Sequence, residues 1–223
     1  MNRRLTGLLK KWQIEGSQPQ DSFDWSSSRP NWVKAFPAHE GFIARLPSAI
    51  GREDVIKICQ GKKHSVIEKF LSVMIWGYGD RGYGPYRVSK MLSQPHAESV
   101  LQAAYDLCQA SKPKEAYQYL TQNRIRNLGP AFGTKYLAFC TPREVGAPIL
   151  DSFVGLWLKE FADKDFEGVG LNYLNWNLKT YSRYWDWVKE HAESFSCNPD
   201  DVELVIFRNA EEVFSSSSKW ASK

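Results

Sequence analysis

Apolar residues recur along this chain at intervals of three and four positions, which is the period of an α-helix. The strongest stretch lies between residues 66 and 75, where the apolar positions are Val66, Ile67, Phe70, Leu71, Met74 and Ile75. So broad an apolar face predicts a helix buried at the centre of the protein. No series of alternating apolar and polar positions indicates a sheet, so the pattern predicts an all-α fold, or nearly so.

Further helices are predicted on both sides of this segment. Residues 1–14 place leucines on one side of a short helix, and residues 153–162 form an apolar helix rich in aromatic rings. Residues 171–193 carry aromatic side chains at helical spacing and predict a long helix. A helix start is indicated at residues 198–201, where Asn, Pro and two Asp suit a cap, a first turn and the positive end of the dipole. The apolar run that follows, residues 202–207, also fits a short strand.

The organisation of the chain is predicted from the places where this pattern fails. Residues 1–50 consist of the first helix and an irregular arm, because Pro37 and Pro47 interrupt any helix there. Residues 51–215 form a helical domain, and residues 216–223 form a loose tail. A chain of 223 residues is long enough for one domain, or for two small lobes that share a core.

Composition narrows the class of protein. The chain carries 29 Lys and Arg against 25 Asp and Glu, a net charge of +4 that permits a basic patch. No run approaches the ~18 apolar residues of a transmembrane helix, and the basic N-terminus lacks the apolar core of a signal peptide. We therefore expect a cytoplasmic protein. The cysteines form no Cys-x-x-Cys pair, which argues against zinc and iron–sulfur sites and favours reduced thiols at Cys59, Cys108, Cys140 and Cys197.

Candidate chemistry begins at a glycine-punctuated stretch, residues 128–135. Its two glycines allow backbone geometry that other residues avoid, and Pro130 cannot continue a helix. A tight hairpin between two short helices fits this pattern, with Lys135 in the first turn of the second helix. The backbone N–H groups at that helix start are suited to a phosphate. Asp151 follows 16 residues after Lys135, at the start of another apolar helix.

This arrangement resembles the helix-hairpin-helix DNA glycosylase superfamily, and above all its 8-oxoguanine-glycosylase-like branch in bacteria. The matching segments are Gly133-Thr134-Lys135 and Leu150-Asp151-Ser152-Phe153-Val154, and residues 76–87 are similar to a segment of bacterial proteins in this branch. The hairpin is one residue longer before the lysine than the usual one, and Phe153 stands where a histidine is usual. The resemblance covers roughly residues 55–210. It implies an all-α, two-lobed helix-hairpin-helix glycosylase fold with the hairpin at residues 124–140.

The resemblance implies a role for each of two catalytic candidates. Lys135 would attack C1′ of the deoxyribose, displace the base and form a Schiff base, which then cuts the strand by β-elimination. Asp151 would stabilise the positive charge that builds on the sugar. A lysine must lose its proton to attack, and the positive end of a helix dipole favours that loss. Plainer roles remain open: Lys135 as a surface lysine on a phosphate, and Asp151 as a helix N-cap, which is compatible with catalysis.

The partner implied by the resemblance is double-stranded DNA, bound by a monomer that uses no cofactor except a monovalent cation at the hairpin. Backbone groups of the hairpin would hold a phosphate, at Gly129, Phe132, Gly133 and Thr134. The candidates for further phosphate contacts, or for the wedge that fills the vacated space, are four arginines, Arg81, Arg87, Arg124 and Arg126. The base pocket, or the wedge that fills the vacated space, is expected to include four rings, Tyr78, Tyr83, Tyr86 and Phe153. For each of these side chains an ordinary packing or solvent-exposed role remains open.

The identity of the excised base is open. The resemblance favours 8-oxoguanine opposite cytosine, whereas the surplus of aromatic residues suits another damaged or bulky modified base, for example in defence against modified phage DNA. Two other functions also remain open. One is a glycosylase without lyase activity, in which water attacks and Lys135 binds phosphate. The other is a DNA-binding module that carries out no chemistry.

Overall fold

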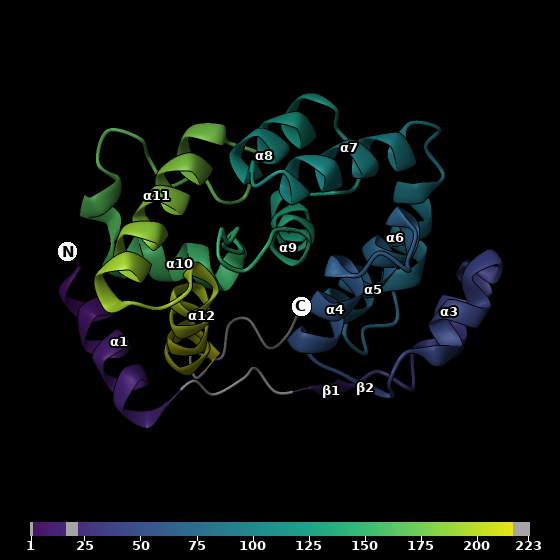
Figure 1. Cartoon of the computed structure of the whole chain (residues 1–223), viewed down its shortest axis with the longest axis horizontal. Coiled ribbons are helices and arrows are strands. Elements are labelled where there is room, and N and C mark those ends of the chain that lie inside the picture. Colours follow the sequence, from purple (N-terminus) through teal and green to yellow (C-terminus); the bar gives the residue numbers. More distant parts are fainter. Residues whose placement is uncertain (1, 17–21, 216–223) are drawn as a thin grey trace. The chain divides into compact units, whose positions relative to one another are not determined.

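The computed structural model describes residues 2–16 and 22–215, and the regular secondary structure of this part of the chain is almost entirely helical (Figure 1). Its only strands are β1 (Phe23–Asp24) and β2 (Ala49–Ile50), which pair antiparallel with Phe23 opposite Ile50. The prediction of an all-α fold is therefore confirmed. The tail expected at residues 216–223 lies outside the described residues, as do residues 17–21 of the expected arm.

Two compact units make up the chain. Unit 1 consists of residues 1–18, 129–134 and 143–223, and unit 2 consists of residues 19–128 and 135–142. Helix α9 (Pro130–Cys140) contributes its start to unit 1 and its remainder to unit 2. The two candidate catalytic residues belong to different units, Lys135 to unit 2 and Asp151 to unit 1.

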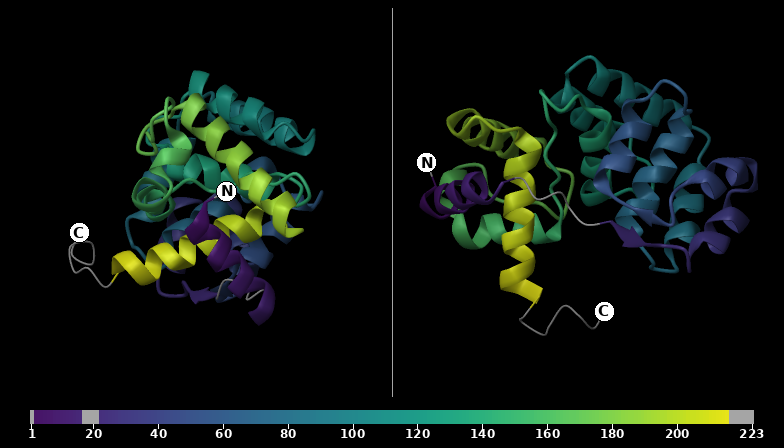
Figure 2. Two further views of the ribbon diagram at one scale, coloured as in Figure 1. Left: turned by 90° about the vertical axis from the view of Figure 1, so that its left-hand side faces the viewer. Right: turned by 60° about the horizontal axis from the view of Figure 1, so that its bottom comes forward.

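Unit 1 is built around α12 (Pro199–Ser215). Its other elements are α1 (Arg3–Glu15), α10 (Ser152–Phe161), the 3-10 helix η2 (Asp163–Phe166) and α11 (Leu178–Phe195). Helices α1, α10 and α11 all pack on α12, and Figure 2 shows α1, in purple, beside α12, in yellow. Trp157 of α10 is buried in this core, and its indole N–H donates to Asn209 Oδ1 at 2.9 Å. The large ring is thereby buried with its polar atom satisfied.

The helix starts of unit 1 follow local capping signals. The backbone N–H of Asn198 donates to Asp201 Oδ2 at 3.0 Å at the start of α12, which confirms the predicted start and shows that residues 202–207 are helical. The long helix predicted from residue 171 begins only at Leu178. Asn177 caps it by accepting the N–H of Thr180 at 3.1 Å. The helix start predicted from periodicity was wrong, because the Asn177 cap begins the helix after the first aromatic residues of the pattern.

Unit 2 is built around α5 (Val66–Tyr78), the helix predicted to be central. Every residue of α5 from Lys69 to Trp76 is buried, which confirms that prediction. The other elements of unit 2 that precede α9 are α2 (Arg29–Ala35), the 3-10 helix η1 (Pro37–His39), α3 (Glu40–Arg45), α4 (Arg52–Gln60), α6 (Gly84–Leu92), α7 (Ala97–Gln109) and α8 (Pro113–Gln122). Helices α4, α6 and α7 pack on α5. A capping box begins α5, since Ser65 Oγ accepts the N–H of Glu68 and Glu68 Oε2 accepts that of Ser65.

The stretch expected to be irregular, residues 31–51, contains short helices instead. Helix α2 has a proline in its first turn, and Pro37 begins η1. A proline at these places starts a helix rather than interrupting one, because the first N–H groups of a helix need no partner within it. Trp25 and Trp32 are fully buried and anchor this segment in the core of unit 2.

Two expectations from composition can be compared with the structure. None of the helices formed by residues 2–16 and 22–215 is long and apolar enough to cross a lipid bilayer. All four cysteines are free thiols, and Cys59, Cys108 and Cys140 are buried as expected.

Candidate functional site

Helix α9 begins earlier than the sequence pattern predicts. It starts at Pro130, and the N–H of Gly133 donates to the carbonyl of Gly129 at 2.9 Å, so the residues between them are already helical. Lys135, the sixth residue counted from Pro130, lies in the second turn, which corrects the predicted first-turn position. Proline is favoured at the first helical position because it has no N–H to satisfy, so Pro130 begins this helix.

The turn before α9 is made by an asparagine rather than by a glycine. Asn127 has a φ of 73°, in the left-handed region, whereas neither Gly129 nor Gly133 has a positive φ. Asparagine tolerates this conformation because its short polar side chain can form local hydrogen bonds. The expectation that the two glycines supply unusual backbone geometry is therefore wrong.

Gly133 is needed for a different reason, which is the close approach of Trp176. A Cβ atom at position 133 would overlap the indole, with Trp176 Cζ2 only 2.8 Å away, whereas a Cβ atom at Gly129 would meet nothing within 4 Å. Gly155 of α10 is covered in the same way by Tyr173, whose Cδ1 would lie 2.6 Å from an added Cβ atom. Both rings therefore lie directly on helix backbone that has no room for a side chain.

Both rings come from residues 167–177, which join η2 to α11 and which we call the clamp loop. Gly168 and Gly170 give it two positive φ angles, and the hydroxyl of Thr180 donates to the Gly170 carbonyl at 2.9 Å. The N–H of Asn172 donates in turn to Thr180 Oγ1 at 3.3 Å. The clamp loop is thus fixed to α11 while its rings cover the start of α9 and the N-terminal half of α10. Sequence reasoning placed these rings in a helix and missed this role.

Thr134 ties the start of α9 to the segment that carries Asp151. Its side chain is fully buried, its hydroxyl accepts the N–H of Leu150 at 3.0 Å, and it donates to the Ala131 carbonyl at 3.3 Å. The hydroxyl of Thr134 is therefore engaged inside the protein. The N–H of Gly133, one of the backbone groups expected at a phosphate, donates to the Gly129 carbonyl inside the helix.

Asp151 is the N-cap of α10, as the plainer of its two expected roles predicted. Its Oδ1 accepts the N–H of Phe153 at 3.1 Å and that of Val154 at 3.2 Å, and the residue is only 9% exposed. The two N–H donors and the positive end of the helix dipole stabilise negative charge on this carboxylate. The cap therefore presents a largely buried anion, which is compatible with the catalytic role.

Helix α12 brings two further side chains toward Asp151. The ring of Phe153, expected in the base pocket or wedge, meets the ring of Phe207 edge to face, with centroids 5.9 Å apart. Burial and the nearby charge of Asp151 raise the pKa of Glu211 above its usual value. Sequence reasoning missed Glu211, because nothing in the local pattern connects it to residue 151. The charge of Asp151 is therefore felt by a carboxyl group of α12.

Lys135 lies half-buried against an aromatic surface of unit 2. Its Nζ is 5.9 Å from the ring centroid of Trp76, and the Arg52 guanidinium carbon is also 5.9 Å from that centroid. Trp76 in turn meets Phe139 of α9 edge to face at 4.9 Å. One buried ring therefore positions the lysine and a second cation.

The end of α9 is held by two glutamine side chains. Gln60 donates to the carbonyls of Phe139 and Thr141, both at 2.9 Å, and Gln109 donates to the carbonyl of Cys140 at 2.7 Å. These bonds satisfy carbonyl groups that have no partner within the helix. The helix that carries Lys135 is therefore fixed at its C-terminal end.

Thiols near this helix are poorly suited to catalysis. Burial raises the pKa of Cys108 to about 12 and raises that of Cys140 well above its usual value. A thiol must ionise to become a strong nucleophile, so neither group competes with Lys135 for that role. The described residues also contain no group of three or more His, Cys, Asp or Glu side chains that could hold a metal ion.

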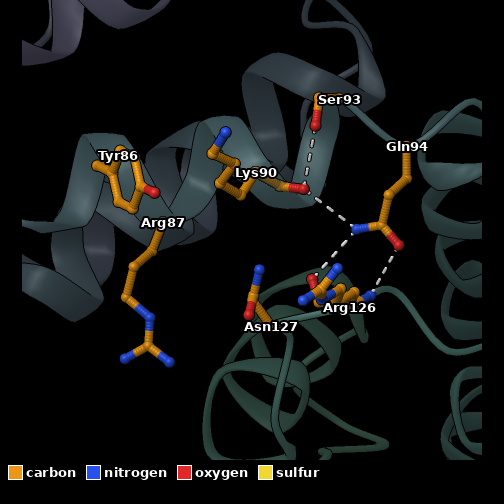
Figure 3. A pocket seen from close by; sticks show the side chains of 7 residues that line it. All are labelled: Tyr86, Arg87, Lys90, Ser93, Gln94, Arg126 and Asn127. Carbon is orange, nitrogen blue, oxygen red and sulfur yellow. Dashed lines mark hydrogen bonds between the residues drawn. The ribbon is translucent and has the colours of Figure 1, made fainter.

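The surface residues expected to contact DNA fall into separate places in unit 2. Tyr86, Arg87 and Arg126 line one pocket of about 500 Å³ (Figure 3). Arg81 and Tyr83 are exposed in the turn between α5 and α6. Tyr78 has the packing role that the sequence left open, since it is 3% exposed and its ring lies 5.6 Å from that of Tyr83. Burial accordingly raises the pKa of Tyr78.

Comparison with known proteins bears on this combination of residues. A family model described as "Putative 8-oxoguanine DNA glycosylase OGG-like protein" matches residues 16–207, a region that includes Lys135, Asp151 and the clamp loop. No curated protein and no solved structure matches the chain. The match extends over most of the sequence and confirms the resemblance drawn from the Lys135 and Asp151 segments. This chain therefore belongs to the OGG-like family of DNA glycosylases.

Proposed function

We propose that this DNA glycosylase is bifunctional: it excises a damaged or modified base, 8-oxoguanine or another, and then cuts the strand through a Schiff base on Lys135. The observation that carries the proposal is the presence of both Lys135 and Asp151 within the matched region, residues 16–207. A module that only binds DNA needs neither side chain, because backbone N–H groups and arginines supply phosphate contacts.

The chemistry assigned to Lys135 begins after the target base has left the stack. The neutral amine forms a bond to C1′, and the electron pair of the glycosidic bond leaves with the base, which takes up a proton. Opening of the sugar ring gives the Schiff base. Loss of a C2′ proton then expels the 3′ phosphate and breaks the strand. The half-buried position of Lys135 beside Trp76 supports this assignment, since an aromatic wall keeps bulk water from part of the amine.

Asp151 contributes electrostatic stabilisation. Positive charge builds on the deoxyribose as the base departs, and a carboxylate with little solvent around it interacts strongly with that charge. The two N–H groups that Asp151 accepts hold its carboxylate in one orientation before the reaction begins. The same contacts let one side chain serve as helix cap and as catalytic anion.

Borohydride trapping on duplexes that contain 8-oxoguanine or an abasic site tests the proposal. The parent protein and a control variant of an exposed lysine elsewhere in unit 2, Lys63→Ala, should form a covalent protein–DNA band. Lys135→Ala should form none. Asp151→Asn keeps a good helix cap, so it should fold normally while base release falls by roughly 10²- to 10³-fold.

The other outcomes identify the alternatives. Base release without a trapped band would replace this mechanism with a monofunctional glycosylase that uses water. If the 8-oxoguanine duplex releases no base and a matched duplex with a bulky modified pyrimidine does, the substrate is such a base rather than 8-oxoguanine. DNA binding without release from any duplex would leave a non-catalytic DNA-binding module.

A further inference from the structure

Three cations of unit 2 line one pocket, and their side chains point in different directions around it (Figure 3). Arg87 and Lys90 lie on α6, and Arg126 lies in the turn before α9. All three are exposed, and none forms an ion pair with any residue in 2–16 or 22–215. Three unmatched positive charges around a concave site attract anions, and phosphate groups fit them best because each cation can donate hydrogen bonds to phosphate oxygens.

The walls of this pocket are held together by protein hydrogen bonds. Gln94, which follows α6, donates to the Arg126 carbonyl at 3.1 Å and accepts the Arg126 N–H at 2.9 Å (Figure 3). The same amide donates to the Met91 carbonyl at 3.1 Å. The neighbouring Asn127 adopts the left-handed conformation that turns the chain toward α9. The three cations therefore project from a braced frame, and their side chains remain available for a ligand.

The size and the rim of the pocket indicate more than a phosphate. A volume of about 500 Å³ is that of a site for a small organic molecule, several times what one phosphate needs. Tyr86, which is 66% exposed, lines it, and Lys90 Nζ lies 5.5 Å from the centre of that ring. An exposed aromatic face beside cations is the arrangement on which a nucleic-acid base stacks while its phosphate is held.

We propose that this pocket holds one nucleotide of a DNA strand, with the phosphate groups on either side of that nucleotide contacted by Arg87, Lys90 and Arg126 and its base stacked on Tyr86. The proposal rests on the proposed function, because it takes DNA as the polymer. Lys135 is not among the residues that line the pocket, so the bound nucleotide is a different one from the nucleotide whose base is excised. The lining is polar and offers a free nucleotide little apolar burial, whereas a nucleotide within a bound strand is delivered at high effective concentration.

Binding measured without catalysis tests the proposal. Fluorescence anisotropy of a labelled lesion-free duplex and of a labelled 12-nucleotide single strand is recorded at several salt concentrations, with every variant placed in a Lys135→Ala background. Arg87→Ala, Lys90→Ala and Arg126→Ala should each lower the salt slope by about one. Tyr86→Ala should weaken single-strand binding roughly 5- to 100-fold with the slope unchanged, and Tyr86→Phe should restore it. The matched control Lys63→Ala should change neither quantity.

Each contrary result has a separate meaning. If the background protein binds DNA but the pocket variants match Lys63→Ala, the pocket assignment is overturned and the proposed function stands. If no DNA binds to the background protein, the proposed function fails first. Competition by thymidine 5′-monophosphate at micromolar concentration, lost in Arg126→Ala while DNA binding persists, would make the pocket a free-nucleotide site instead. Thermal unfolding of each variant, unchanged within about 2 °C, shows that a loss of binding is not a loss of folding.

Discussion

The start of α9 in unit 1 and the basic pocket of unit 2 are built in opposite ways. At the start of α9 the hydroxyl of Thr134 accepts a hydrogen bond from the N–H of Leu150. The ring of Trp176 packs directly on Gly133 and leaves no room for a side chain there. In the pocket the side chains of Arg87, Lys90 and Arg126 have no counter-charge among the residues that the structure describes. The first region is shaped by packing, so substitutions there should cost stability. The second is shaped for a ligand, so substitutions there should cost binding.

The largest stability effect is expected at Gly133. Gly133→Ala should lower the free energy of unfolding by about 1–3 kcal/mol, because the new methyl group must displace Trp176. This loss should appear even though alanine is the better helix former. Gly129→Ala is the matched control, and it should be neutral or stabilising by up to about 1 kcal/mol, since its Cβ would meet nothing. Denaturant unfolding measures both changes.

A double-mutant cycle sharpens that test. In a Trp176→Ala background the ring is gone, so Gly133→Ala should no longer destabilise the protein. An equal loss in both backgrounds would mean that the clamp loop does not constrain the start of α9. The contrast between the two regions would then lose its physical basis.

An effect of similar size is expected at Thr134. Thr134→Val keeps the shape of the side chain but leaves the buried N–H of Leu150 without its acceptor, which should cost about 1–3 kcal/mol. Thr134→Ser keeps the hydroxyl and should cost less. Hydrogen exchange of the Leu150 amide reports the bond directly, because its protection should fall in the valine variant alone. Equal protection in both variants would contradict the assignment.

Asn127 lines the pocket and adopts the left-handed backbone conformation, so the shape of the pocket depends on this residue. Asn127→Ala should cost about 1–2 kcal/mol, because alanine disfavours the left-handed region, whereas Asn127→Gly should be close to neutral. Arg126→Ala, one residue earlier, should change stability by no more than about 0.5 kcal/mol. Thermal unfolding of the three variants compares them. A large loss for Arg126→Ala would show that this side chain belongs to the frame and not to the binding surface.

The smallest expected effect is a dependence of the stability of unit 1 on pH. Burial lowers the pKa of His191 below its usual 6.5, so the folded protein keeps this ring neutral while the unfolded chain takes up a proton. Stability is therefore complete above about pH 6.5 and declines as the pH falls below it. Glu211 limits this decline. Its pKa is raised in the folded protein, so it takes up a proton as the pH falls, and that uptake favours the folded state. Thermal unfolding between pH 5 and 7.5 should show a smaller acid loss in His191→Gln than in the parent.

The candidate site was only partly predictable from the residues that compose it. Lys135 and Asp151 were identified because short motifs surround them, and the cap at Asp151 follows from its place before an apolar helix. The position of Lys135 in the second turn was not predicted, because the sequence pattern placed Pro130 in the middle of a hairpin and not at the start of a helix. The clamp loop gave no local signal, because it packs on helices that are distant from it in the sequence.

The sequence by itself determined the helical class, the central helix α5, the start of α12 and the family, because periodicity, caps and motifs are carried by residues close together in the chain. Only the tertiary structure decided why Gly133 is a glycine, where the hydroxyl of Thr134 is engaged, and which cations share a pocket with Tyr86. Those properties depend on side chains that meet after folding from separate elements. Contacts of that kind produce no repeating pattern in the sequence. Packing requires that two side chains fit together in space, whatever the number of residues between them in the chain.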